Sequence, residues 1–232
     1  MPTPPGPVEP PPSRWAFPSL SDAAADGPLV VGGDLAPGTL LLAYRSGLFP
    51  MPHRRRLAWF SPDPRAVLPA GGVHVARSLR RTLTRFRITV DTEFRHVVES
   101  CGDPRRPSGW ITRDIIDAYC ELHALGWAHS VEVWSEERLV GGLYGVGIGA
   151  FFAGESMFHR VTGASKVAMI ATDRIVGSVR GSLFDVQWAT DHLRMMGVVE
   201  VSRAAYLSRL APAVDSVGPD WSAEVDLLDP AP

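Results

Sequence analysis

The pattern of residues in the central part of the chain limits the folds that it can adopt. Residues 130–134, 138–147 and 150–158 are rich in apolar and aromatic side chains and are separated by short turns, which predicts three neighbouring strands. The long apolar stretch at 164–180 then predicts a helix, and residues 183–188 predict a fourth strand. This order of strands, helix and strand indicates an α+β domain with a mixed central sheet.

Three polar residues interrupt these apolar patterns. Because successive side chains of a strand point to opposite faces, we expect Asp185 and Gln187 to share one face. The neighbours predicted on the other face are Phe184, Val186 and Trp188. With Glu155 offered from another strand, they form a candidate site for handling an amine and a carbonyl. The simpler alternative is that the three polar groups satisfy backbone groups or one another inside the core.

Composition divides the chain into four parts. Residues 1–14 contain seven prolines and are expected to be a disordered tail, residues 15–64 a small N-terminal domain, residues 65–218 the α+β domain, and residues 219–232 an acidic tail. In the small domain, Pro37 and Gly47 mark the start and end of a short helix, and residues 59–65 are expected to be a loop. Further strands are predicted at 87–91 and 198–201, and further helices at 76–85, 92–101, 112–125, 191–196 and 202–210.

The net charge of −2 hides an uneven distribution of charges along the chain. Residues 54–113 contain thirteen arginines and only five acidic residues. A positive face of this kind suits a polyanion, although a solvated basic helix is the plainer alternative. The arginines that we expect on this face are Arg77, Arg80, Arg81 and Arg85, together with Arg105 and Arg106.

Several classes of protein are disfavoured. The apolar runs are too short for a membrane span, and the chain does not begin with the pattern of a secretory signal peptide. Cys101 and Cys120 are the only cysteines and are expected to be reduced, so we expect a cytoplasmic protein. Cys120, His123 and His129 have the only metal-like spacing, and we expect neither a metal nor another cofactor there.

The order of elements and the run ERLVGGLYGV at 137–146 resemble the central strands of the N-acetyltransferase (GNAT) fold. An acetyl-coenzyme A enzyme of that fold would hold the pyrophosphate with a glycine-rich loop at a helix start. Here Gly177 lies within a predicted helix and lacks a second glycine, and Gly145, Gly147 and Gly149 are expected within strands. A GNAT-like fold is therefore expected, whereas a coenzyme A-dependent N-acyltransferase stays a less favoured alternative.

A series of ordered blocks from about residue 17 to residue 210 resembles the leucyl/phenylalanyl-tRNA–protein transferase family. The blocks are GGDL at 32–35, YRSGLFP at 44–50, SPDPRAVL at 61–68, HVARSL at 74–79, WIT at 110–112, LHALG at 122–126, AHSVEVW at 128–134, GESMF at 154–158 and ASK at 164–166.

The resemblance implies a reaction. Leucine or phenylalanine, and by extension methionine, would move from aminoacyl-tRNA to the α-amine of proteins that begin with Arg or Lys, which marks them for N-degron proteolysis. No metal or organic cofactor is implied, and we expect the chain to act as a monomer. A non-catalytic tRNA-binding or degron-binding module is a further alternative, which an intact set of polar residues at the site disfavours.

The resemblance also implies roles for individual residues. Asp185 and Gln187 would position the attacking amine and the ester carbonyl, and Glu155 would bind the cationic acceptor. Trp110 and Tyr119 would contact the terminal adenosine of the tRNA, and the arginine face would contact the tRNA body. The pocket for the transferred side chain would be lined by Leu143, Phe152, Met157, Met169 and Val176.

Two features depart from the family pattern. Met51 takes the place of an aromatic residue after Phe49 and Pro50, and a run of three arginines, Arg54 to Arg56, follows it. Thr172 and Val176 stand where bulkier apolar residues are common in the family. We therefore expect the nucleotide contact and the amino-acid preference to differ from the family's usual behaviour.

Overall fold

The computed structural model describes residues 6–75, 83–106, 109–223, 225 and 227. In this part of the chain the strands form two sheets. The smaller sheet has the order β1-β3-β2, with β1 Pro28–Val31, β2 Phe49–His53 and β3 Arg56–Phe60. The larger has the order β10-β4-β9-β8-β7-β6-β5, with β4 Arg65–Leu68, β5 Arg87–Val90, β6 Ala128–Ser135, β7 Arg138–Ile148, β8 Phe151–His159, β9 Leu183–Gln187 and β10 Val199–Val201. Neighbouring strands run antiparallel except β8 and β9, which are parallel, so the larger sheet is mixed as expected.

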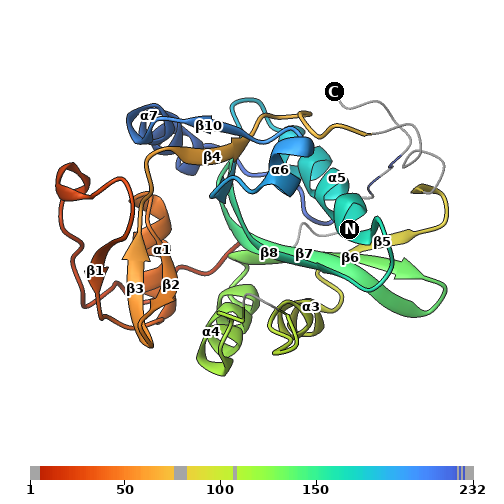
Figure 1. Cartoon of the computed structure of the whole chain (residues 1–232), viewed down its shortest axis with the longest axis horizontal. Coiled ribbons are helices and arrows are strands. Elements are labelled where there is room, and N and C mark those ends of the chain that lie inside the picture. Colours follow the sequence, from red (N-terminus) through yellow and green to blue (C-terminus); the bar gives the residue numbers. More distant parts are fainter. Residues whose placement is uncertain (1–5, 76–82, 107–108, 224, 226, 228–232) are drawn as a thin grey trace.

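Helices cover both faces of the larger sheet (Figure 1). Helix α5 (Ala164–Gly177) packs on one face, and α3 (Phe94–Cys101) and α4 (Arg113–Ala124) pack on the other. Helix α1 (Pro37–Arg45) accompanies the smaller sheet and contacts both α4 and α7 (Arg203–Val214). The remaining elements are α6 Asp191–Met195 and the short 3-10 helix η1 Leu20–Asp22.

The predicted order of the central elements is confirmed. Strands β6, β7 and β8 form the meander, α5 follows, and β9 returns beside β8. The predicted cap of α4 is also present, since the Thr112 hydroxyl accepts a hydrogen bond from the Ile115 N–H at 3.4 Å. Elements β5, β10, α3, α6 and α7 correspond to the other predicted strands and helices, whereas most of the helix predicted at 76–85 lies outside the described residues.

The loop predicted at residues 59–65 is wrong at both ends. Trp59 and Phe60 complete β3, and Arg65 begins β4 of the larger sheet. Prolines concealed this arrangement, because β2 contains Pro50 and Pro52 and yet pairs with β3. Strand β2 lies at the edge of its sheet, where a missing N–H group is tolerated. The chain passes from one sheet to the other between residues 60 and 65, close to the predicted boundary.

The described part of the first fourteen residues packs against the domain. The Val8 N–H donates to the Leu125 carbonyl at 2.8 Å, and the Trp127 indole N–H donates to the Val8 carbonyl at 2.8 Å. Glu9 accepts two hydrogen bonds from Arg45, at 2.6 and 3.0 Å. The prediction of disorder is therefore wrong for residues 6–14. Prolines restrict the unfolded chain, so such a segment loses little conformational entropy when it docks.

The described part of the C-terminal segment is packed as well. The Trp221 ring stacks on His129 with ring centroids 4.2 Å apart and planes within 7°. Leu227 is buried in the core on the α5 side of the sheet. These contacts arise from apolar residues within a segment that sequence analysis described only as acidic.

Gly47 ends α1 in a conformation that favours glycine. Its φ is +81°, and its N–H donates to the Tyr44 carbonyl at 3.0 Å. A Cβ atom at this position would lie 2.6 Å from the Cδ2 atom of Leu207 on α7. Gly47 therefore permits both the turn after α1 and the close approach of α7.

We predict that Gly47→Ala lowers the free energy of unfolding by about 2–5 kcal/mol. The left-handed conformation costs about 1–2 kcal/mol for a residue with a Cβ, and overpacking against Leu207 adds about 1–3 kcal/mol. Gly181→Ala is a matched control, because Gly181 also has a φ of +81° but has no atom within 4 Å of the added Cβ. Urea denaturation of both variants would measure the difference, and equal losses would contradict the contribution of packing.

Candidate active site

Two irregularities in the larger sheet create the candidate site. The parallel pairing of β8 with β9 ends at Ala153 and Asp185, after which β8 continues beside β7 and β9 continues beside β4. On β8, Gly154 and Ser156 pair with consecutive residues of β7, so Glu155 is the extra residue of a bulge. On β9, Val186 is skipped in the same way. Bulges re-aim side chains and are frequent next to active sites.

Asp185 lies at the centre of a buried hydrogen-bond network. Arg65 donates to both carboxylate oxygens, with Nε 2.8 Å from Oδ1 and Nη2 2.5 Å from Oδ2. The Tyr206 hydroxyl donates to Oδ2 at 3.1 Å, and the Gln187 N–H donates to Oδ1 at 2.9 Å. Asp185 and Arg65 are both 0% exposed, so this is a bidentate ion pair in the protein interior.

The surroundings of Arg65 also favour its charged form. Its guanidinium carbon lies 4.7 Å from the centre of the Phe49 ring and 4.5 Å from that of Tyr206. Its Nη1 atom donates to the Gly47 carbonyl at 3.1 Å. Burial alone would lower the pKa of Arg65, but the negative charge of Asp185 outweighs this effect and raises it.

This network changes the role expected for Asp185. Both carboxylate oxygens already accept two hydrogen bonds each, and none of the side chain is exposed. The carboxylate is therefore not placed to receive an acceptor ammonium, contrary to what the resemblance implied. Asp185 instead fixes the backbone of Gln187, which makes it a positioning residue.

Gln187 adopts a conformation that its neighbours enforce. Its φ is +61°, a region that costs a residue other than glycine about 1–3 kcal/mol. The hydrogen bond from its N–H to Asp185 holds this conformation. The alternation predicted for β9 consequently ends here: Phe184 and Val186 join the core on the α5 side, but Trp188 packs against the other core cluster. Trp188 was therefore placed wrongly by the strand pattern.

The side chains of Gln187 and Glu155 contain polar atoms that are not satisfied. Within the described part of the chain, the buried atoms Nε2 of Gln187 and Oε1 of Glu155 have no hydrogen-bond partner. The hydroxyls of Ser61 and Tyr144 are in the same situation. Buried polar groups are normally paired, so unpaired atoms at two neighbouring bulges favour a site that is completed by a ligand.

Two tyrosines hold Glu155. The Tyr119 hydroxyl donates to Glu155 Oε2 at 3.0 Å and is itself hydrogen-bonded to the Tyr44 hydroxyl from α1. Burial raises the pKa of Glu155 to about 7, the nearby hydroxyls of Tyr44 and Tyr119 oppose the rise, and the charge of Asp185 adds to it. Burial also keeps the pKa values of both tyrosines well above their ordinary range, so they remain hydrogen-bond donors.

The two aromatic residues expected near the adenosine differ in their exposure to solvent. Trp110 is partly exposed at the edge of the core, as a stacking platform requires. Tyr119 is 0% exposed, and its ring packs edge-on against Tyr144 at 5.6 Å. A base cannot stack on a ring without an exposed face, and the Tyr119 hydroxyl donates to Glu155 instead.

The residues expected to line an apolar pocket lie together. Four of them are buried in the core cluster on the α5 side of the sheet, and the fifth packs against it. They are Leu143, Phe152, Met169 and Val176, with Met157 partly buried. Their common location agrees with a pocket beside β8 and also with an ordinary core, so their contact with the transferred side chain stays a prediction.

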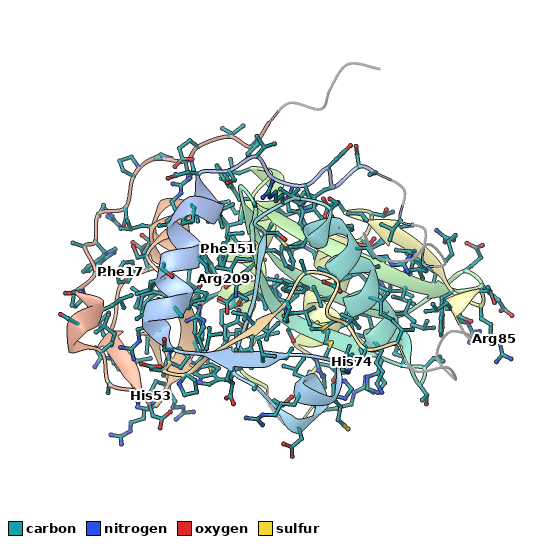
Figure 2. All side chains as sticks on the ribbon, turned by 90° about the horizontal axis from the view of Figure 1, so that it is seen from above. Phe17, His53, His74, Arg85, Phe151 and Arg209 are labelled. Carbon is teal, nitrogen blue, oxygen red and sulfur yellow. The ribbon has the colours of Figure 1, made fainter. Side chains whose placement is uncertain are left out.

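The arginine face can be followed only in part. Arg77, Arg80 and Arg81 lie outside the described residues, whereas Arg85 is exposed at the periphery (Figure 2). Arg105 forms an ion pair with Asp103 at 2.6 Å, and Arg106 donates to the carbonyls of Cys101 and Met157 at 2.8 and 2.9 Å. Arg106 is thus anchored to the backbone. Docking of the tRNA body on this face stays a prediction.

The residues with metal-like spacing have other contacts. His123 stacks on Phe94 with ring centroids 4.2 Å apart, and its Nδ1 atom lies 2.8 Å from the Ala128 carbonyl oxygen. Among the described residues, no three His, Cys, Asp or Glu side chains come together as a possible ligand set. In the same part of the chain, no helix is long and apolar enough to cross a bilayer.

The sequence of this chain is similar to that of a known protein family. The model of the leucyl/phenylalanyl-tRNA protein transferase matches residues 67–211, and the model of the N-terminal domain of that transferase matches residues 33–63. The chain belongs to the leucyl/phenylalanyl-tRNA–protein transferase family. The first match contains Glu155, Asp185 and Gln187, the second contains Tyr44, and Arg65 lies in the interval between them.

Individual relatives agree over most of their length. A leucyl/phenylalanyl-tRNA–protein transferase of Tolumonas auensis is 48% identical over 86% of this chain and 88% of the relative. One from Anaeromyxobacter sp. strain K is 46% identical over 88% and 90%, and one from Escherichia coli O139:H28 is 44% identical over 84% and 86%.

Sequence reasoning missed Arg65, Tyr206 and Tyr44 as parts of the site. Arg65 is the most informative omission, because it precedes the apolar run Ala66 to Leu68 and is itself buried. A charged residue that begins a buried strand requires a partner of opposite charge. That signal could have marked Arg65 as a residue in need of a buried carboxylate, although the sequence does not say which one.

We predict that Arg65→Met lowers the free energy of unfolding by about 3–5 kcal/mol, because it leaves the Asp185 charge buried without a partner. Arg65→Met combined with Asp185→Asn removes both charges, and the amide can still accept the hydrogen bond from the Gln187 N–H. This double variant should therefore recover at least half of the lost stability. Chemical denaturation at pH 7 would measure both, and a double variant as unstable as the single one would contradict the ion-pair account.

Proposed function

We propose that this chain transfers a leucyl or phenylalanyl group, and also methionyl, from tRNA to the N-terminal amine of proteins that begin with Arg or Lys. The observation that carries the proposal is the pair of unsatisfied polar atoms, Glu155 Oε1 and Gln187 Nε2, at the point where β8 and β9 part. Membership of the family supports the donor. Since charged tRNA is cytoplasmic, the reaction would take place there, and it marks its substrates for N-degron proteolysis.

The chemistry requires positioning rather than a covalent enzyme intermediate. The amine nitrogen of the acceptor attacks the ester carbonyl, a C–N bond forms, the C–O bond to the ribose breaks, and the ribose oxygen leaves with the proton from the amine. The Gln187 amide would donate to the carbonyl oxygen, where negative charge develops. Its conformation, fixed by Asp185, would hold that donor in place before the substrate arrives.

The sheet supports a GNAT-like arrangement for this reaction. In the larger sheet, the parallel strands β8 and β9 pair only up to Ala153 and Asp185 and then follow different neighbours. The two modules meet at the same place, because Tyr44 from α1 is hydrogen-bonded to Tyr119, which donates to Glu155. A donor and an acceptor that enter from different sides would meet at Glu155 and Gln187.

A donor assay would test the proposal. We expect radiolabel to pass from leucyl-tRNA or phenylalanyl-tRNA to peptides that begin with Arg or Lys, but not from acetyl-coenzyme A. Gln187→Ala should lower turnover by about 10²–10³-fold, the effect of losing one donor to a developing oxyanion, while tRNA binding persists. Transfer from acetyl-coenzyme A would favour a different acyltransferase, and tRNA binding without transfer would favour a binding module.

Glu155 gives the proposed acceptor site a pH dependence. A pKa of about 7 means that the carboxyl is neutral at lower pH and ionised at higher pH. We predict that the KM for an Arg-starting peptide rises as the pH falls below about 7, because a neutral carboxyl attracts the acceptor cation less strongly. Steady-state kinetics between pH 5.5 and about 8, near the pKa of an α-amine, would measure this dependence.

Glu155→Gln is the matching variant for this test. It should raise the KM for the peptide by roughly tenfold or more at pH 8, as expected for loss of a charged hydrogen bond worth about 1.5–3 kcal/mol. The part of the pH dependence that arises from Glu155 should disappear, which leaves that of the peptide amine. If Glu155→Gln raised the KM for charged tRNA equally, the acceptor role would be wrong.

A further inference from the structure

The turn between β2 and β3 has a conformation that its residues do not favour. His53 pairs with Arg56, so Arg54 and Arg55 form the two-residue turn of this hairpin. Their φ values are +47° and +65°, which is the left-handed pattern of a type I′ turn. Asn and Gly are the residues that this turn favours, and each non-glycine residue there costs about 1–2 kcal/mol. Two arginines at these positions indicate that something other than stability determines their identity.

The arginines of this turn are also available to a partner. Arg54, Arg55 and Arg56 are all exposed. No hydrogen bond or ion pair joins the side chain of any of the three to a residue that the structure describes. By contrast, Arg65, Arg105 and other arginines of the same sequence region are paired with a carboxylate. The tip of the hairpin is therefore a concentrated positive charge without a counter-charge from the described residues.

The hairpin stands beside the candidate active site. The His53 ring lies 6.3 Å from the Phe60 ring, and Phe60 lies 5.7 Å from the ring of Trp188, the residue that follows Gln187. Phe49, which begins the hairpin, packs on Trp188 at 4.8 Å. Figure 2 shows His53 at the periphery of the molecule, so the hairpin leads from the site to the surface.

The charge of the tip selects between the two substrates. The proposed acceptor begins with Arg or Lys and carries an α-ammonium, so three arginines at the tip of the hairpin would repel it. The tRNA donor carries a phosphate on every nucleotide next to the aminoacylated end, and arginine binds phosphate with a planar, bidentate set of donors. Only the donor has the complementary charge.

We propose that Arg54, Arg55 and Arg56 bind the phosphates of the acceptor arm of the tRNA. This inference rests on the proposed function, because it takes the aminoacylated end of the tRNA to lie at Gln187. The hairpin is held by backbone pairing and by its aromatic contacts with Trp188, so its position relative to Gln187 is fixed. The arginines would thereby set the direction in which the acceptor arm leaves the site.

A variant of this turn can remove positive charge without destabilising the fold. Arg54→Asn with Arg55→Gly installs the residues that a type I′ turn favours, so its thermal unfolding temperature should be equal to or higher than that of the parent protein. The same variant removes two positive charges. Its affinity for uncharged tRNA-Leu should fall, and the slope of log K against log salt concentration should become shallower by about 0.7–0.9 for each lost phosphate contact.

Two controls complete the experiment. Arg138→Ala with Arg180→Ala removes the same charge from exposed arginines elsewhere on the surface and should keep the parent slope. Arg54→Lys with Arg55→Lys keeps the charge and should retain most of the slope. A parent slope in the Asn-Gly variant, or an equal loss in the Arg138 and Arg180 control, would overturn the proposal.

A different measurement, the transfer of leucine, tests the proposed function itself. If the parent protein does not transfer leucine from charged tRNA, the function is wrong whatever the hairpin binds. If the parent transfers leucine and the Asn-Gly variant needs the same tRNA concentration for half-maximal rate, only the hairpin proposal is wrong. We expect the variant to require several-fold more tRNA, with the KM for the peptide unchanged.

Discussion

The buried ion pair between Arg65 and Asp185 holds together parts of the molecule that are far apart in sequence. Through Arg65 it joins the start of β4 to the carbonyl of Gly47 at the end of α1, and through Tyr206 it joins α7. Asp185 in turn fixes the left-handed backbone of Gln187. Taking two charges out of water costs several kcal/mol for each ion, so the geometry must be nearly complete to offset that cost. The ion pair is better understood as a device that fixes the site than as a source of stability.

Glu155, unlike Asp185, is a buried carboxyl without a cationic partner among the residues that the structure describes. Its pKa of about 7 exceeds the ordinary value of 4.5 because burial disfavours the charged form. The folded protein therefore holds a proton that the unfolded chain releases, and this contribution to stability is present below pH 4.5 and is lost as the pH rises through 7. The molecule thus tolerates a carboxyl that weakens the fold at neutral pH. A carboxyl with a pKa shifted in this way is typical of functional sites.

The long strands and helices could be predicted from sequence, because regular elements follow a repeating apolar pattern. The meander β6–β8, α5 and β9 all follow such a pattern, and the positions of Glu155, Asp185 and Gln187 emerged from its interruptions. Features that depart from regular geometry could not be predicted from this pattern. The bulge at Val186 sent Trp188 to the other core cluster, and edge position allowed β2 to contain two prolines. The saturation of Asp185 depends on Arg65, 120 residues away in sequence, which local spacing does not indicate.

The hydrogen bond between Tyr44 and Tyr119 limits which N-terminal modules can be exchanged between related chains. One hydroxyl belongs to the N-terminal module and the other to the large domain, and together they determine how Glu155 is held. Neither module by itself therefore contains all the groups that hold Glu155. A chimera that exchanges the first 60 residues between relatives would preserve both sheets, but it would work only where α1 delivers a hydroxyl at the same depth. The two modules therefore act as one unit around Glu155, although the chain builds them as separate sheets.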